Sequence, residues 1–156
     1  MFVTDETVVP AEPGRLWAGL TSLAETGELR RASQAAYRQG GAQLRVGPLG
    51  DRPGLSKLVA VRFLAPLEHG GTPTLPLRWE ATGPAGELFP VLDANLIAVP
   101  EGPAKTRLVL TGAYRPPLGR VGSTLDKAIL NRVAHATLRA LLSSLADVLT
   151  TSGRVS

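Results

Sequence analysis

The chain of 156 residues contains no cysteine. It therefore has no disulfide, no thiolate nucleophile and no thiolate metal ligand. Histidine is scarce as well: His69 and His135 have no carboxylate or hydroxyl partner at a spacing typical of a catalytic triad. Two histidines without cysteine are also too few for a zinc site of the usual kind. We therefore expect no metal site and no other cofactor, and we assign no catalytic residue.

Long apolar runs are also missing. No segment approaches the ~18 uninterrupted apolar residues that a membrane helix requires. The first ten residues, MFVTDETVVP, carry two acids and no basic residue, which is unlike a secretory signal. These features favour a cytoplasmic protein without an integral membrane segment.

The formal net charge of +4 permits an anionic partner. The arginines, however, are spread from Arg15 to Arg154, and the tightest group is Arg30, Arg31 and Arg38. No nucleic-acid recognition motif lies near that group. We therefore expect no nucleic-acid partner.

Most of the chain reads as strands. Residues 2–9 alternate in polarity and end at Pro10, which indicates a strand. Two short helices follow, over 11–20 and 27–37, the first with Pro13 in its first turn. Further strands are predicted over 42–46, 57–65, 74–82, 88–99 and 105–114, with a loop at 68–71. Consecutive strands with short links predict an antiparallel meander.

The last third of the chain predicts one long helix, from Thr124 to Thr150. Ser123 and Asp126 have the spacing of a capping box, and the helix would be roughly 40 Å long. At 100° per residue, the polar side chains Arg132, His135, Arg139 and Ser143 gather on one side. The opposite, apolar face is formed by Leu130, Ala134, Leu138, Leu141, Leu145, Val148 and Leu149. Such a face has to be buried against a broad surface.

These elements together predict an α+β fold in one domain, residues 1–152. A curved antiparallel sheet of six or seven strands would wrap around the long C-terminal helix, with two short helices after the first strand.

Several segments at the joints of this fold resemble a known superfamily. They are Pro13–Trp17, Leu77–Gly83, Leu88–Ala94 and Thr106–Gly119, the last leading into the long helix. Together they resemble the START-like superfamily, whose helix-grip or birch-pollen-allergen fold is described in bacteria as polyketide cyclase/dehydrase or SRPBCC. The resemblance covers essentially the whole chain and implies an elongated apolar cavity between the sheet and the long helix.

Several of the residues that we expect near this cavity have two possible roles. Arg62 either holds an anionic group of a ligand or forms a salt bridge with Glu80 or Asp93 across the sheet. Asp126 and Thr137 either anchor a ligand or serve the helix itself. The full set of expected lining residues is Arg62, Trp79, Leu110, Tyr114, Asp126, Ile129, Val133 and Thr137.

Trp79 and Tyr114 either face the ligand or fill the core. Asp93 and Asn95 either form a polar pair inside the cavity or lie on the wet side of a one-sided sheet, and we favour the second.

Three functions fit this fold. The first is binding or transport of a hydrophobic small molecule, such as a lipid, an isoprenoid or an aromatic polyketide. The second is an enzyme of the cyclase, aromatase or dehydratase type, a lyase that uses the same cavity. The third is an adaptor that contacts a protein partner, and the chain could also form a homodimer. The small number of groups suited to catalysis favours the first function.

Overall fold

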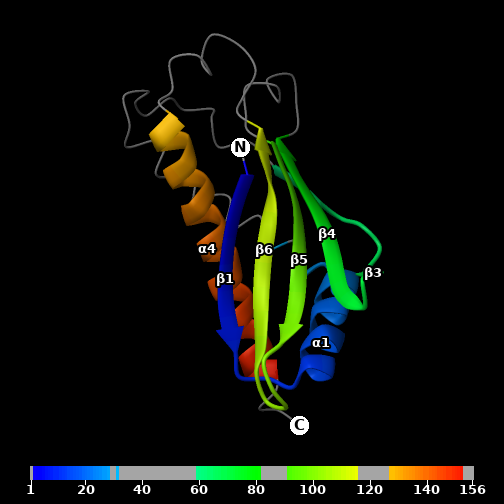
Figure 1. Cartoon of the computed structure of the whole chain (residues 1–156). Helices are drawn as coiled ribbons and strands as arrows, with labels where there is room; N and C mark the ends of the chain where they lie inside the picture. The colour runs from blue at the N-terminus through cyan, green and yellow to red at the C-terminus, as the bar shows by residue number, and fades with distance from the viewer. Residues whose placement is uncertain (1, 29–30, 32–58, 82–90, 116–126, 153–156) are drawn as a thin grey trace.

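A computed structural model describes residues 2–28, 31, 59–81, 91–115 and 127–152 (Figure 1). The elements in chain order are β1 (Phe2–Val9), α1 (Pro13–Thr26), β2 (Val59–Phe63), β3 (Leu67–His69), β4 (Thr72–Ala81), β5 (Val91–Pro100), β6 (Thr106–Arg115) and α4 (Lys127–Ser152). The strand expected over 42–46 and the capping box at Ser123 lie outside the described residues, as does most of the helix expected over 27–37.

The strands form one antiparallel sheet in the order β1-β6-β5-β4-β2, and β3 also pairs with β4. β4, β5 and β6 are neighbours both in the chain and in the sheet, so the expected meander is confirmed. The sheet curves around α4, and α1 follows the first strand (Figure 1). The expected α+β class is therefore confirmed.

The prediction of a loop at residues 68–71 is wrong in part. Residues 67–69 form β3, which pairs with β4 through Leu67 and Thr74, Glu68 and Pro73, and His69 and Thr72. Gly70 and Gly71 join the two strands with φ values of 60° and 78°. Two successive residues of positive φ match the twist of a tight hairpin, and glycine adopts them without strain. The glycine pair is thus a hairpin turn, and β4 begins two residues earlier than expected.

The faces of the sheet differ, because side chains alternate along each strand. The inner face, which faces α4, carries a largely apolar buried set: Val3, Val9, Leu75, Leu77, Trp79, Leu92, Ala94, Leu96, Ala98, Thr106, Leu108, Leu110 and Tyr114. The outer face carries charged and half-buried side chains. Asp93 and Asn95 lie on this outer face, as expected, and Asn95 is exposed.

α4 buries the apolar face that its periodicity predicts. Its buried residues are Ala134, Leu138, Leu141, Leu142, Leu145 and Leu149, whereas Arg132, Arg139 and Ser143 are exposed. Leu142 was not expected there. Val148 and His135, expected on opposite faces, are both half-buried, and the side chain of Leu130 is outside the described part of the chain. The buried stripe is wider than a single sheet contact requires, because α4 packs against α1 as well as against β1 and β6.

α1 closes the end of the interior that is lower in Figure 1. Glu12 begins the helix by accepting hydrogen bonds from the backbone N–H groups of Gly14 and Arg15. Leu16, Leu20 and Leu23 are buried. A Cβ at Gly19 would lie 2.9 Å from Cδ2 of Leu149, so the absence of a side chain there lets α1 approach α4.

We expect Leu141→Ala to lower the free energy of unfolding by ~2–5 kcal/mol, because Leu141 is completely buried and its truncation leaves a cavity. Urea unfolding of both proteins measures the difference, and Ser143→Ala on the exposed side of α4 is the control. A loss well under 1 kcal/mol for Leu141→Ala would contradict the packing of α4 described here.

Candidate functional site

The lower part of the interior is filled by large aliphatic side chains. Leu75, Leu96 and Leu110 lie opposite one another on β4, β5 and β6, and each is at most 1% exposed. They belong to one hydrophobic cluster with leucines of both helices. We call the following residues the leucine layer: Leu16, Leu20, Leu75, Leu96, Leu108, Leu110, Leu138, Leu141, Leu142 and Leu145.

The upper part of the inner face has a different composition. Here β4 and β6 end and β5 begins (Figure 1). Leu77, Ala94 and Gly112 form one row across β4, β5 and β6, and Trp79, Leu92 and Tyr114 form the next. We call these six residues the upper band. It combines two small residues with two aromatic side chains that each carry a hydrogen-bond donor.

Gly112 permits a close approach of β5 and β6 in the upper band. A Cβ at this position would lie 2.4 Å from the backbone oxygen of Asp93 and 2.6 Å from Cβ of Ala94. Neither distance is compatible with a side chain. Glycine inside a strand often marks such an approach of two backbones.

Of the expected lining residues on the sheet, Trp79, Leu110 and Tyr114 lie on the inner face. They are 1%, 0% and 6% exposed. Trp79 and Tyr114 belong to the upper band, two strands apart, and Leu110 belongs to the leucine layer. The structure thus separates Leu110 from the two aromatic residues by the row that contains Gly112.

The expected residues of the long helix are only partly described. Ile129, Val133 and Thr137 belong to α4, but the orientation of their side chains is outside the described part of the chain, and so is Asp126. Ala134 is 3% exposed, and Leu138 follows it by one turn. The small residue therefore precedes the leucine layer along the helix.

Arg62 does not lie on the inner face. It is opposite Arg78 in the pairing of β2 with β4, and the neighbours of Arg78 in β4, Leu77 and Trp79, point inward. Arg62 therefore points outward, and its side chain is 69% exposed. Our expectation of Arg62 as a lining residue is corrected accordingly, and the alternative, a salt bridge with Glu80, is observed.

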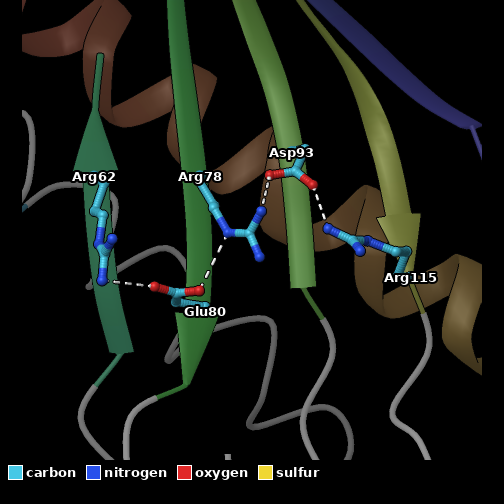
Figure 2. A network of polar contacts seen from close by, with 5 residues as sticks. All are labelled: Arg62, Arg78, Glu80, Asp93 and Arg115. Atoms are coloured by element: carbon cyan, nitrogen blue, oxygen red, sulfur yellow. Dashed lines mark hydrogen bonds and ion pairs between the residues drawn. The ribbon is translucent and has the colours of Figure 1, made fainter. Parts of the chain in front are cut away.

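The outer face carries an ion-pair network that links four strands (Figure 2). Glu80 accepts contacts from Nη2 of Arg62 and Nε of Arg78, both at 3.1 Å. Asp93 accepts contacts from Nη1 of Arg78 at 3.2 Å and Nη2 of Arg115 at 2.6 Å. Charges of opposite sign alternate across β2, β4, β5 and β6. The network therefore supports the pairing of these strands from the solvent side.

A second polar contact joins the edge of the sheet to α4. Asp5 shares the inner face of β1 with Val3, and its side chain is 18% exposed. It accepts a hydrogen bond from the backbone N–H of Glu6 at 2.9 Å and one from Nε of Arg139 at 3.4 Å. The contact links α4 to β1 at the surface, where an exposed ion pair contributes little stability.

Sequence reasoning did not identify Leu92, Ala94 and Gly112 as site residues. Alternation along residues 88–99 separates Leu92 and Ala94 from Asp93, so their shared face could have been predicted. The close approach at Gly112 could not, because it depends on the register between β5 and β6.

Within the described ranges, no three histidine, aspartate or glutamate side chains are grouped so that they could hold a metal ion. The same part of the chain has no helix that is long and apolar enough to cross a membrane.

We expect Arg62→Ala to lower the free energy of unfolding by less than about 1 kcal/mol, because an exposed ion pair contributes little. Arg78→Ala should cost more, since Arg78 contacts both carboxylates of the network. Urea unfolding at low and high sodium chloride concentration measures both effects, and the difference between the two variants should shrink with salt. A larger loss for Arg62→Ala than for Arg78→Ala would contradict this arrangement.

Gly112→Ala should destabilise the protein by about 1–3 kcal/mol or more, because the added methyl group meets the backbone of β5. Thr111→Ala, on the outer face of the same strand, is the control. Equal thermal stability of Gly112→Ala and the unchanged protein would show that β5 and β6 do not approach this closely.

No protein-family model matches the chain, and no curated protein matches it in sequence. Solved structures do match. The protein TTHA0849 from Thermus thermophilus has 17% identity and a TM-score of 0.55, over 97% of this chain and 99% of that one. A conserved protein from Geobacillus kaustophilus has 11% identity and a TM-score of 0.56, over 97% of both chains.

The Zhui aromatase/cyclase from Streptomyces sp. R1128 has 15% identity and a TM-score of 0.49, over 100% of this chain and 96% of that one. At these identities the likeness is one of fold, and fold alone does not assign an activity. With its curved antiparallel sheet, a helix after the first strand and the long helix α4, the chain has the helix-grip fold that its sequence predicts.

Proposed function

We propose that this protein binds a hydrophobic small molecule between the upper band and α4. The observation that carries the proposal is the change in side-chain size along the inner face. Leucines predominate in the lower part, whereas the upper part combines Ala94 and Gly112 with two leucines and two aromatic residues. Ligand sites are mostly apolar and contain a few polar groups that orient the ligand.

The upper band supplies apolar surface. Leu77 and Leu92 contribute aliphatic side chains, and Trp79 and Tyr114 contribute large rings. A hydrophobic molecule suits such a surface.

The direct test compares the mass of the freshly purified protein under native and denaturing conditions, followed by organic extraction of the released material. A stoichiometric apolar adduct would support the proposal and identify the ligand class. A ligand that returns chemically changed after incubation would instead indicate an enzyme of the cyclase type. Protein that stays empty when offered apolar compounds would contradict the proposal.

Ala134→Trp should weaken binding on the order of tenfold or more, because the new ring occupies the space beside a buried alanine of α4. Anilinonaphthalene sulfonate, whose fluorescence rises in apolar surroundings, serves as the probe. Ser143→Trp is the matched control, since it adds the same side chain to the exposed side of α4.

Overpacking at Ala134 can also cost stability, typically ~1–3 kcal/mol, so a thermal melt must accompany each binding curve. A folded Ala134→Trp variant that binds the probe as well as the Ser143→Trp variant does would place the ligand elsewhere.

A further inference from the structure

β1 forms one edge of the sheet (Figure 1). All eight of its residues pair with β6 on one side. On its other side, no strand in the described part of the chain pairs with it. The edge strand of a sheet carries a row of backbone N–H and C=O groups that can pair with a further strand. This free edge of β1 is therefore a surface on which another chain could add a strand.

The turn between β5 and β6 shows which backbone groups of β1 point to the free edge. The N–H of Glu101 donates to the carbonyl oxygen of Lys105 at 2.9 Å. Hydrogen bonds to one neighbouring strand recur at every second residue, so the odd-numbered residues of β6 bond to β5 and the even-numbered ones to β1. The even-numbered residues of β6 lie opposite odd-numbered residues of β1. The groups that point to the free edge therefore belong to Phe2, Thr4, Glu6 and Val8.

Glu6 agrees with this assignment, because its N–H donates to the carboxylate of Asp5 at 2.9 Å. The side chains of the four edge-pointing residues lie on the outer face, and all four residues are exposed. Phe2 is 88% exposed and Val8 is 49% exposed. The free edge thus has a large exposed apolar side chain near each end, with a threonine and a glutamate between them.

Two copies of β1 can pair antiparallel about a two-fold axis if their edge-pointing residues lie opposite one another. With the axis at Asp5, Phe2 lies opposite Val8 of the second copy, and Thr4 lies opposite Glu6. An axis at Glu6 would place two glutamates opposite each other, which is destabilising. An axis at Thr4 would place Phe2 opposite Glu6. The register with its axis at Asp5 is therefore the self-complementary one.

The axis at Asp5 brings two aspartates together on the inner side of the joined sheets. The carboxylate of Asp5 contacts Nε of Arg139 at 3.4 Å. The side chain of Arg139 is 75% exposed, so a second copy can approach it. Two carboxylates and two guanidinium groups carry no net charge together, and the arginines offset the repulsion between the aspartates.

We propose that the free edge of β1 pairs with β1 of a second copy of this chain, antiparallel about a two-fold axis at Asp5. The two sheets then form one continuous sheet. Roughly eight backbone hydrogen bonds join the two strands, two for each of the four opposed pairs of edge-pointing residues. One strand from each copy makes a small interface, so we expect a dissociation constant in the micromolar range. This assembly does not depend on the ligand proposed above.

The test is analytical ultracentrifugation from about 5 to 200 µM protein, a range that covers micromolar dissociation constants. The unchanged protein should approach twice the chain mass of 16.4 kDa at the highest concentration. Val8→Lys and Phe2→Glu should each weaken association about tenfold or more, because each places a charge opposite an apolar side chain. The double variant Phe2→Glu/Val8→Lys should associate more tightly than either single variant, because its two new side chains lie opposite each other with opposite charges.

Leu67→Lys is the matched control. Leu67 is 45% exposed and belongs to β3, which pairs with β4 and not with β1, so this substitution should leave association unchanged. Circular dichroism of each variant checks that it is folded. A mass of one chain at every concentration would overturn the proposal. A dimer that persists in Val8→Lys, or that the double variant does not restore, would overturn the pairing at Asp5.

Discussion

The burial of the leucine face of α4 against the inner face of the sheet is the constraint on which the rest depends. α4 is 26 residues long, and its apolar stripe is too broad for one neighbour, so both the sheet and α1 cover it. Burying a leucine contributes about 1.5–3 kcal/mol, and this face contains five of them. The sheet has to lie along this helix, and within it β5 and β6 approach closely at Gly112.

The two faces of the sheet contribute to the structure in different ways. The outer face holds strands β2, β4, β5 and β6 in register through alternating charges that solvent screens, so each pair adds little alone. The inner face packs leucines below and combines small, aliphatic and aromatic side chains above. Because the ion pairs lie outside, the upper band keeps an apolar character with only indole and phenol groups as polar points.

Much of the fold could be predicted, because it follows from local periodicity. The wheel of α4 identified Ala134, Leu138, Leu141, Leu145 and Leu149, all of which are buried. The wheel omitted Leu142. The burial of Leu142 depends on how much of α4 the sheet and α1 cover together, and the sequence does not show this.

The candidate site was harder to predict. Residues 57–65 are apolar on both faces apart from Lys57 and Arg62, so alternation could not tell which way Arg62 points. The register with Arg78 decides it. The close approach at Gly112 arises only because Gly112 of β6 pairs with Ala94 of β5. Register and close approach are properties of the assembled sheet and not of any single segment.

The most direct measurement of where a ligand lies is nuclear Overhauser spectroscopy on protein with isotope-labelled alanine methyl groups and unlabelled anilinonaphthalene sulfonate. The methyls of Ala94 and Ala134 belong to the inner face and to the buried side of α4, whereas Ala113 lies on the outer face beside Phe2. A ligand between the upper band and α4 should give transfer to Ala94 and Ala134 and none to Ala113. Transfer to Ala113 alone would contradict it.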